Sequence, residues 1–208
     1  YGQNPYIDAA VDIFNVAYDD VTKDQRLVGK VAVLSLGYGG SVGAFQSMAR
    51  NYGLHLPEAL VLAIVKAWRA KNNWATAFWR NLQNAALEAV DMPGMHKGAG
   101  RVTFIMEGDC LFCQLPSGRR LCYPQIRIEP PPPDKQWAGR GLTAIKPSSK
   151  PKAGVMKWPR ERLWGGLLAE NVTQAMCADL LMHALGLAEE HLGDTVVGHT
   201  HDELLIEV

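Results

Sequence analysis

The stretch Asp24–Gly40, DQRLVGKVAVLSLGYGG, places Arg26, Lys30, Leu34 and Tyr38 four residues apart before the chain becomes glycine-rich. On an α-helix, residues four apart drift by only about 40° around the axis, so these four side chains share one band. The stretch therefore predicts a helix that carries two cations, an aliphatic side chain and an aromatic side chain along one face.

The residues around this band indicate where the helix begins and which face it buries. Thr22 followed by Gln25 is typical of a capping box at a helix N-terminus. Val28 and Ala32 lie on the side opposite the band and favour packing against the protein. We expect a helix over 23–36 with an apolar inner face.

The rest of the chain predicts a mixed α+β layout. The expected elements, in chain order, are helices over 41–51, 57–72 and 72–94, a hairpin over 110–128, an exposed proline-rich loop over 129–141, short strands at 142–145 and 154–157, a long helix over 163–192 and two short strands over 195–208. We expect three parts: a mostly helical part over 1–95, a β-rich part with a Pro/Lys-rich loop over 96–160, and the long helix with its terminal hairpin over 161–208.

Composition bounds the class of protein. With 208 residues, 48% of them hydrophobic, the chain is long enough to bury a sizeable core. It has no apolar run of membrane-spanning length and no signal-peptide layout, so we expect a cytoplasmic protein with no membrane partner. Four cysteines are few for this length and are expected to be reduced. Because the sequence stops within an expected strand, we expect a fragment of a larger polypeptide.

Charge is unevenly distributed, although the formal net charge is zero. Basic residues dominate 134–162, and after Arg162 there is no Lys or Arg while acidic residues continue to the end. This separation suits a protein that holds a polyanion on one part and cations on another. Ordinary surface charge with one basic loop accounts for the same pattern.

The opening band suggests a phosphate site. Arg26 and Lys30, one turn apart, have the reach to clamp a triphosphate, with Arg as a fork and Lys as a point charge. Leu34 would then lie beside a sugar, and Tyr38 would stack on a base. The alternative is a solvated amphipathic helix with Leu34 and Tyr38 in the core.

Two further groups suggest metal chemistry. His201, Asp202 and Glu203 fall at the expected terminal turn, where neighbouring carboxylates can hold Mg²⁺; a plain polar turn is the alternative. Cys110 and Cys113 form a C-x-x-C, but with Cys122 as the only other nearby cysteine a zinc site lacks ligands. Buried, reduced thiols in strands are the favoured interpretation of these three cysteines.

Three blocks in order resemble family A DNA polymerases, the bacterial DNA polymerase I type, and in particular their phage and prophage branch. The blocks are KDQRLVGKVAVLSLGYGGSVGAFQSMARNYG, LWGGLLAENVTQAMCADLL and GHTHDELLIEV. The resemblance covers nearly the whole chain. It implies an α+β fold made of a helical fingers subdomain and part of a palm with a small antiparallel sheet.

The resemblance implies roles for the opening helix. Arg26 and Lys30 match the fingers residues that bind the incoming triphosphate, and Tyr38 with Gly39 matches the pair beside the templating base. Leu34 stands where many members have Phe or Tyr against the sugar, which puts sugar discrimination in doubt.

Roles are implied for other positions as well. Gln174 matches a minor-groove contact, His201 a primer-terminus contact, and Asp202 a carboxylate ligand of the catalytic Mg²⁺ ions, with Glu203 beside it. Tyr6 matches, more weakly, a position near the phosphates.

The implied function is a template-directed DNA polymerase that adds dNTPs to a primer 3′-end by two-metal phosphoryl transfer. Lys30 would also donate a proton to the leaving pyrophosphate. The implied partners are primer–template DNA, dNTP and the remainder of the polymerase chain. The family's first metal-binding aspartate, in a D-x-S motif, is absent, so we expect the 208 residues to be inactive alone. The rivals are a non-catalytic nucleic-acid-binding module of the same fold and a zinc-stabilised helical interaction protein.

Overall fold

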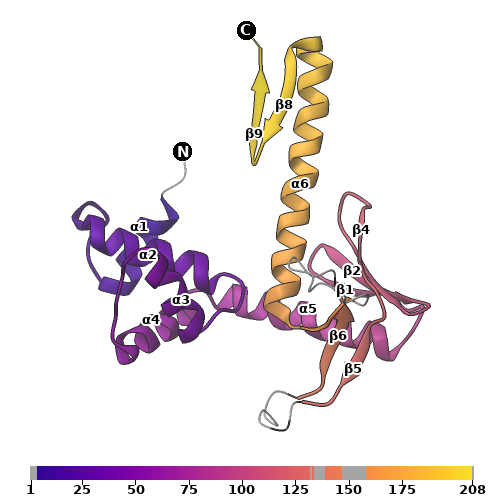
Figure 1. Cartoon of the computed structure of the whole chain (residues 1–208), viewed down its shortest axis with the longest axis horizontal. Helices are drawn as coiled ribbons and strands as arrows, with labels where there is room; N and C mark the ends of the chain where they lie inside the picture. Colours follow the sequence, from indigo (N-terminus) through magenta and orange to yellow (C-terminus); the bar gives the residue numbers. More distant parts are fainter. Residues whose placement is uncertain (1–3, 132, 134–138, 147–157, 208) are drawn as a thin grey trace.

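The N-terminal helices and a set of small sheets are connected through two long helices in a computed structural model that describes residues 4–131, 133, 139–146 and 158–207 (Figure 1). The helices are α1 (Pro5–Phe14), α2 (Lys23–Leu36), α3 (Val42–Asn51), α4 (Glu58–Lys71), α5 (Asn73–Asp91) and α6 (Gly165–Leu192), with short 3₁₀ turns at Tyr18–Asp20 and Gly193–Thr195. The strands are β1 (Lys97–Ala99), β2 (Val102–Glu107), β3 (Cys110–Gln114), β4 (Arg120–Tyr123), β5 (Arg127–Glu129), β6 (Gly141–Ile145), β7 (Arg160–Leu163), β8 (Val196–Thr200) and β9 (Glu203–Ile206).

All strand pairs are antiparallel. One sheet has the order β1-β2-β3-β4, a second has the order β5-β6-β7, and β8 pairs with β9 alone. Pro116–Gly118 lies in the connection between β3 and β4, as the sequence predicts. Antiparallel strands need no crossover helix, so each sheet forms from strands that follow one another in the sequence.

The helical part has its own apolar cluster. Helices α2, α3 and α4 bury one face each against one another, around Phe45 and Leu36, which are fully buried. Trp68 of α4 and Trp79 of α5 are stacked with ring centroids 6.2 Å apart and planes 7° from parallel. This stack connects the helical cluster to α5.

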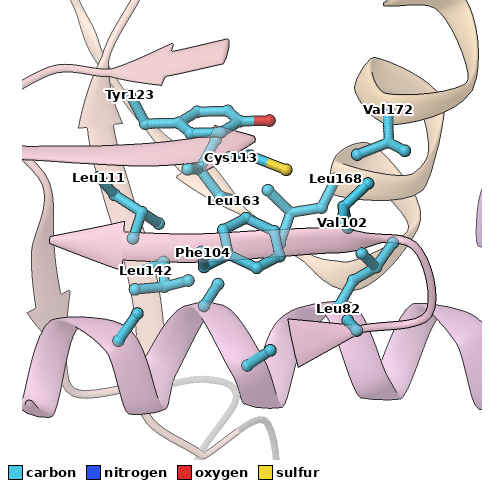
Figure 2. Packing of buried hydrophobic residues seen from close by; sticks show 14 of the residues in the cluster. Leu82, Val102, Phe104, Leu111, Cys113, Tyr123, Leu142, Leu163, Leu168 and Val172 are labelled. Atoms are coloured by element: carbon cyan, nitrogen blue, oxygen red, sulfur yellow. The ribbon is translucent and has the colours of Figure 1, made fainter. Parts of the chain in front are cut away.

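The β-rich part packs on α5 and on the first half of α6 (Figure 2). Phe104 and Leu111 from the first sheet, Leu142 from the second and Leu168 from α6 are all at most 1% exposed. Strand alternation explains this, because every second residue of a strand faces the same side. Helix α5 contributes to both clusters, so it joins the two parts.

The α+β prediction is confirmed, as are the helix over 23–36 and the long C-terminal helix. Helix α1 and strands β1, β2, β5 and β7 are additional to the elements predicted. The hairpin predicted over 110–128 ends with β4 at Tyr123, because Arg127–Glu129 pairs with β6 in the second sheet. The strand predicted at 154–157 lies outside the described residues. The basic segment 135–162 is described only in part. None of the described helices is long and apolar enough to cross a membrane.

Candidate functional site

The predicted band on α2 is exposed at its aromatic end. A capping box at Thr22 fixes the first turn of the helix. Val28 and Ala32 are buried on the inner face, whereas Leu34 is 42% exposed and Tyr38 is 36% exposed. The alternative that places Leu34 and Tyr38 in the core is therefore wrong.

The two cations of the band lie against aromatic rings. The Arg26 guanidinium carbon is 5.7 Å from the ring centroid of Tyr6, and Lys30 Nζ is 4.8 Å from that of Tyr52. Helix α1 comes this close because residue 29 is glycine: a Cβ there would collide with the Tyr6 carbonyl oxygen. Neither cation forms an ion pair within the described part of the chain. Aromatic rings hold a cation without neutralising it, so its charge remains available to an anion.

The glycine-rich end of α2 packs directly on the N-terminus of α6. Gly39 has a φ of +83°, a conformation that favours glycine. A Cβ at Gly166 would collide with the carbonyl oxygen of Tyr38, and a Cβ at Gly165 with that of Trp79. The glycine pairs in GYGG and LWGG thus allow segments far apart in sequence to touch through their backbones.

A pocket of about 490 Å³ opens at this contact, and we call it the α2–α6 pocket. Its lining comprises Leu34, Ser35, Tyr38, Gly39, Gly40, Ala44, Ser47, Met48, Asn51, Trp164 and Glu170. Tyr38 and Trp164 supply aromatic surface, while Ser47 and Asn51 supply hydrogen-bonding groups. Aromatic surface with a few polar groups suits a planar heterocycle such as a nucleobase.

Gln174 lies one turn beyond this pocket on α6. Its side chain is exposed, and its Nε2 donates to the Glu170 carboxylate at 3.3 Å. Since Glu170 lines the pocket, Gln174 is connected to the same site through a hydrogen bond.

The terminal turn is separate from this site. His201 has a φ of +53°; His201 and Asp202 lie between β8 and β9, Glu203 begins β9, and all three are exposed. In the described ranges, no hydrogen bond, ion pair or pocket joins them to α2, and no three His, Cys, Asp or Glu residues are grouped to hold a metal ion. The β8–β9 hairpin lies beside the distal end of α6 (Figure 1). The structure thus brings together Arg26, Lys30, Leu34, Tyr38, Gly39 and Tyr6, with Gln174 nearby, but not the HDE turn.

The cysteine pattern is that of strand residues. Cys113 is fully buried in the core (Figure 2), whereas Cys110, three residues earlier on β3, is on the opposite face. Cys110 and Cys113 therefore cannot coordinate the same metal ion. The zinc hypothesis, which needs both thiols as ligands, is not supported. Burial raises the pKa of the Cys113 thiol to about 12. All four cysteines are free. The prediction of buried thiols is confirmed for Cys113 and wrong for Cys122, which is exposed, while Cys110 is only partly buried.

Comparison with known proteins relates the chain to a DNA polymerase. In an alignment of 209 positions that covers 98% of this chain, the chain is 38% identical to a protein of Bacillus phage SP02 described as a DNA polymerase. The match spans 30% of the length of that protein. No family model matches the chain.

Trp164, Glu170 and the residues of α3 that line the α2–α6 pocket were not predicted as site residues from the sequence. A signal was present in the two glycine pairs, because paired glycines mark close backbone approach. The pairs GYGG and LWGG are more than one hundred residues apart, however, and nothing local connects them.

Proposed function

We propose that this chain forms the nucleotide-binding part of a DNA polymerase that adds dNTPs to a primer 3′-end under the direction of a template. The observation that carries the proposal is the α2–α6 pocket, which adjoins a helix with two cations that have no acidic partner in the described part. The similarity to a segment of a phage DNA polymerase supports it.

The incoming nucleotide would lie along the exposed band of α2. Its triphosphate would be bound by Arg26 and Lys30, with Tyr6 beside Arg26, and its sugar would contact Leu34. The templating base would enter the α2–α6 pocket against Tyr38. Arg26, Lys30 and Leu34 lie on one helix and Tyr38 directly follows it, so the helix backbone sets the spacing between the phosphate and sugar sites, and the turn after it sets the place of the base.

The reaction is phosphoryl transfer. The primer 3′-hydroxyl loses its proton and attacks the α-phosphorus, and the bond from this phosphorus to the bridging oxygen of the β-phosphate breaks to release pyrophosphate. Arg26 and Lys30 would stabilise charge on the leaving group, and Lys30 would donate a proton to it. Positioning and charge neutralisation carry most of such catalysis.

Contacts with DNA would come from the other end of the site. Gln174 is exposed on α6 one turn from the pocket, in a position to donate to a base edge in the minor groove. His201, exposed at the terminal turn, would contact the primer terminus. Glycine residues at the end of α2 would supply the freedom for the helical part to close on the terminal turn.

The acidic turn matches Mg²⁺ in the type of its donors but not in their number. Asp202 and Glu203 offer exposed carboxylate oxygens, the ligands that Mg²⁺ prefers. The described residues add no third ligand. When bound, Mg²⁺ would neutralise phosphate charge, so we assign Asp202 as one ligand, with Glu203 beside it, and further carboxylates to the rest of the polymerase chain.

Binding of a dNTP by the 208-residue chain tests the site without requiring activity. We measure dNTP binding by isothermal titration calorimetry and expect Lys30→Ala and Arg26→Ala each to weaken it about tenfold through loss of a charge-assisted hydrogen bond. Lys66→Ala, an exposed cation on α4, is the matched control and should bind normally. Equal affinity in all four proteins would overturn the assignment of the triphosphate.

Primer extension tests the catalytic role. In a chimera, this chain replaces the matching segment of the Bacillus phage SP02 protein, and circular dichroism verifies folding. We expect extension that is lost with Asp202→Asn, whereas the 208-residue chain alone should not extend a primer. A folded chimera that binds DNA but shows no dependence on dNTP would favour the non-catalytic binding module.

A further inference from the structure

A second pocket, of about 400 Å³, lies next to the α2–α6 pocket and shares Gly39 and Trp164 with it. We call it the α5–α6 pocket, because α5 lines it with Thr76, Arg80 and Asn84, and α6 lines it with its first residues. The shared residues make the two pockets neighbours on one surface. One extended ligand can therefore occupy both.

The α5–α6 pocket is positively charged. Arg69 and Arg80 line it, and its lining contains no Asp or Glu. Arg69 is held in place by a bond from Nη2 to the Gly40 carbonyl oxygen at 2.9 Å, while its Nε is buried and has no partner among the described residues. Arg80 is exposed and forms no ion pair within the described ranges. Because Arg69 Nε is shielded from solvent, what Arg69 offers a ligand is its positive charge, which together with that of Arg80 favours an anion in the pocket.

The N-terminus of α6 adds to this charge. Gly165 and Gly166, the first residues of this 28-residue helix, line the pocket. The Gly165 N–H donates to Gln83 Oε1 at 3.0 Å, and the N-cap residue Trp164 provides no side-chain cap. A helix N-terminus carries a partial positive charge that favours phosphate. Two arginines and a helix terminus therefore converge on one pocket.

We propose that the α5–α6 pocket binds a backbone phosphate of the template strand, next to the base held in the α2–α6 pocket. This rests on the proposed function. The incoming triphosphate is the other candidate source of phosphate, but Arg26 lies in the first turn of α2 and Lys30 at its middle. About 9 Å of helix axis separates Lys30 from Leu36, and Gly39 lies beyond that. Arg69 and Arg80 would hold the strand as it enters the site, through a contact that carries no sequence information.

The test compares Arg80→Ala with the wild-type 208-residue chain in fluorescence anisotropy. The probes are a primer–template duplex with a single-stranded 5′ overhang and the same duplex with blunt ends. We expect Arg80→Ala to weaken binding of the overhang duplex about fivefold and to lower its salt dependence by about one counterion, with blunt-duplex binding unchanged. Arg80→Lys should retain part of the affinity, because it keeps the charge but loses the fork.

Arg101→Ala is the matched control, since Arg101 is exposed in the turn between β1 and β2. Equal loss in this control, or no loss in Arg80→Ala, would overturn the inference. Weaker dNTP binding in Arg80→Ala would assign the pocket to the triphosphate instead. If the wild-type chain bound neither duplex, the proposed function itself would fail, which distinguishes the two failures.

Discussion

The two halves of helix α6 have opposite surroundings. From Gly165 to Ala175 the helix buries six residues against α5, the end of α2 and the sheets, while from there to Leu192 it buries none. The distal half is nevertheless apolar: Leu180 is 68% exposed and Met182 is 48% exposed. The adjoining β8–β9 hairpin is likewise exposed and apolar at several positions.

This difference shows that a segment can be a regular helix without being packed against the rest of the protein. The proximal half holds the pocket, whose shape is fixed by backbone contacts and a packed core. The distal half and its hairpin carry the HDE turn on a two-stranded sheet, which is marginally stable by itself. Exposed apolar surface of this kind marks an interaction surface, consistent with our assignment of further metal ligands to the rest of a polymerase chain.

Truncating one leucine in each half should show the contrast most strongly. Leu168 is fully buried, so Leu168→Ala should lower the free energy of unfolding by about 3 kcal/mol, through lost burial and the cavity left behind. Leu180→Ala should change it by less than about 0.5 kcal/mol. Urea denaturation of the 208-residue chain measures both. Similar losses in the two variants would mean that the distal half is packed after all.

Alanine at two of the three glycines of α6 should act in opposite directions. A Cβ at Gly166 would collide with backbone, so Gly166→Ala should destabilise the chain by about 2 kcal/mol. At Gly186 a Cβ meets nothing within 4 Å, so Gly186→Ala should stabilise the helix by up to about 1 kcal/mol through its higher propensity. The midpoints of urea denaturation show whether each substitution raises or lowers the stability of the chain. Stabilisation by Gly166→Ala would show that α2 and α6 do not touch there.

Local signals in the sequence were sufficient for most elements. The capping box at Thr22 located the start of α2, and Pro116–Gly118 located the turn between β3 and β4, since both signals act within a few residues. Helix α1 also had a local signal that the prediction did not use: Asn4 caps it and Pro5 stands at its first position.

Other features depend on contacts that no local pattern contains. Strand β7 includes Arg160 and Arg162, charged residues that obscure the usual alternation, and it exists because β6 pairs with it. The pocket depends on Gly166 meeting Tyr38, a contact between distant segments. Leu34 and Tyr38 are exposed because α1, α3 and α4 cover a different face of α2. The spacing of the band alone does not tell whether these two side chains are exposed or in the core.

The contact between Asp179 of α6 and the connection from β3 to β4 should have the smallest effect on stability, and this effect depends on pH. Asp179 Oδ2 accepts from Ser117 Oγ at 2.6 Å, and its Oδ1 accepts from Arg119 Nε at 2.6 Å. The Ser117 hydrogen bond, and then Arg119, lowers the pKa of Asp179. A carboxylate whose folded pKa is depressed stabilises the fold above its unfolded pKa, and this contribution is lost as the pH falls below about 4.

Asp179→Asn removes this titration, so its urea midpoint should be slightly lower than that of the wild type at pH 7, and the two should converge as the pH falls below about 4. Asp202→Asn, which alters an exposed carboxylate beyond the packed half, is the control and should follow the wild-type pH profile. A constant gap between Asp179→Asn and wild type at every pH would mean that the carboxylate charge is not what links the hairpin of β3 and β4 to α6. In that case the boundary between the two halves would rest on apolar burial, on the Arg119 bond to the Ala175 carbonyl oxygen and on the bond from Asn171 Nδ2 to the Tyr123 hydroxyl.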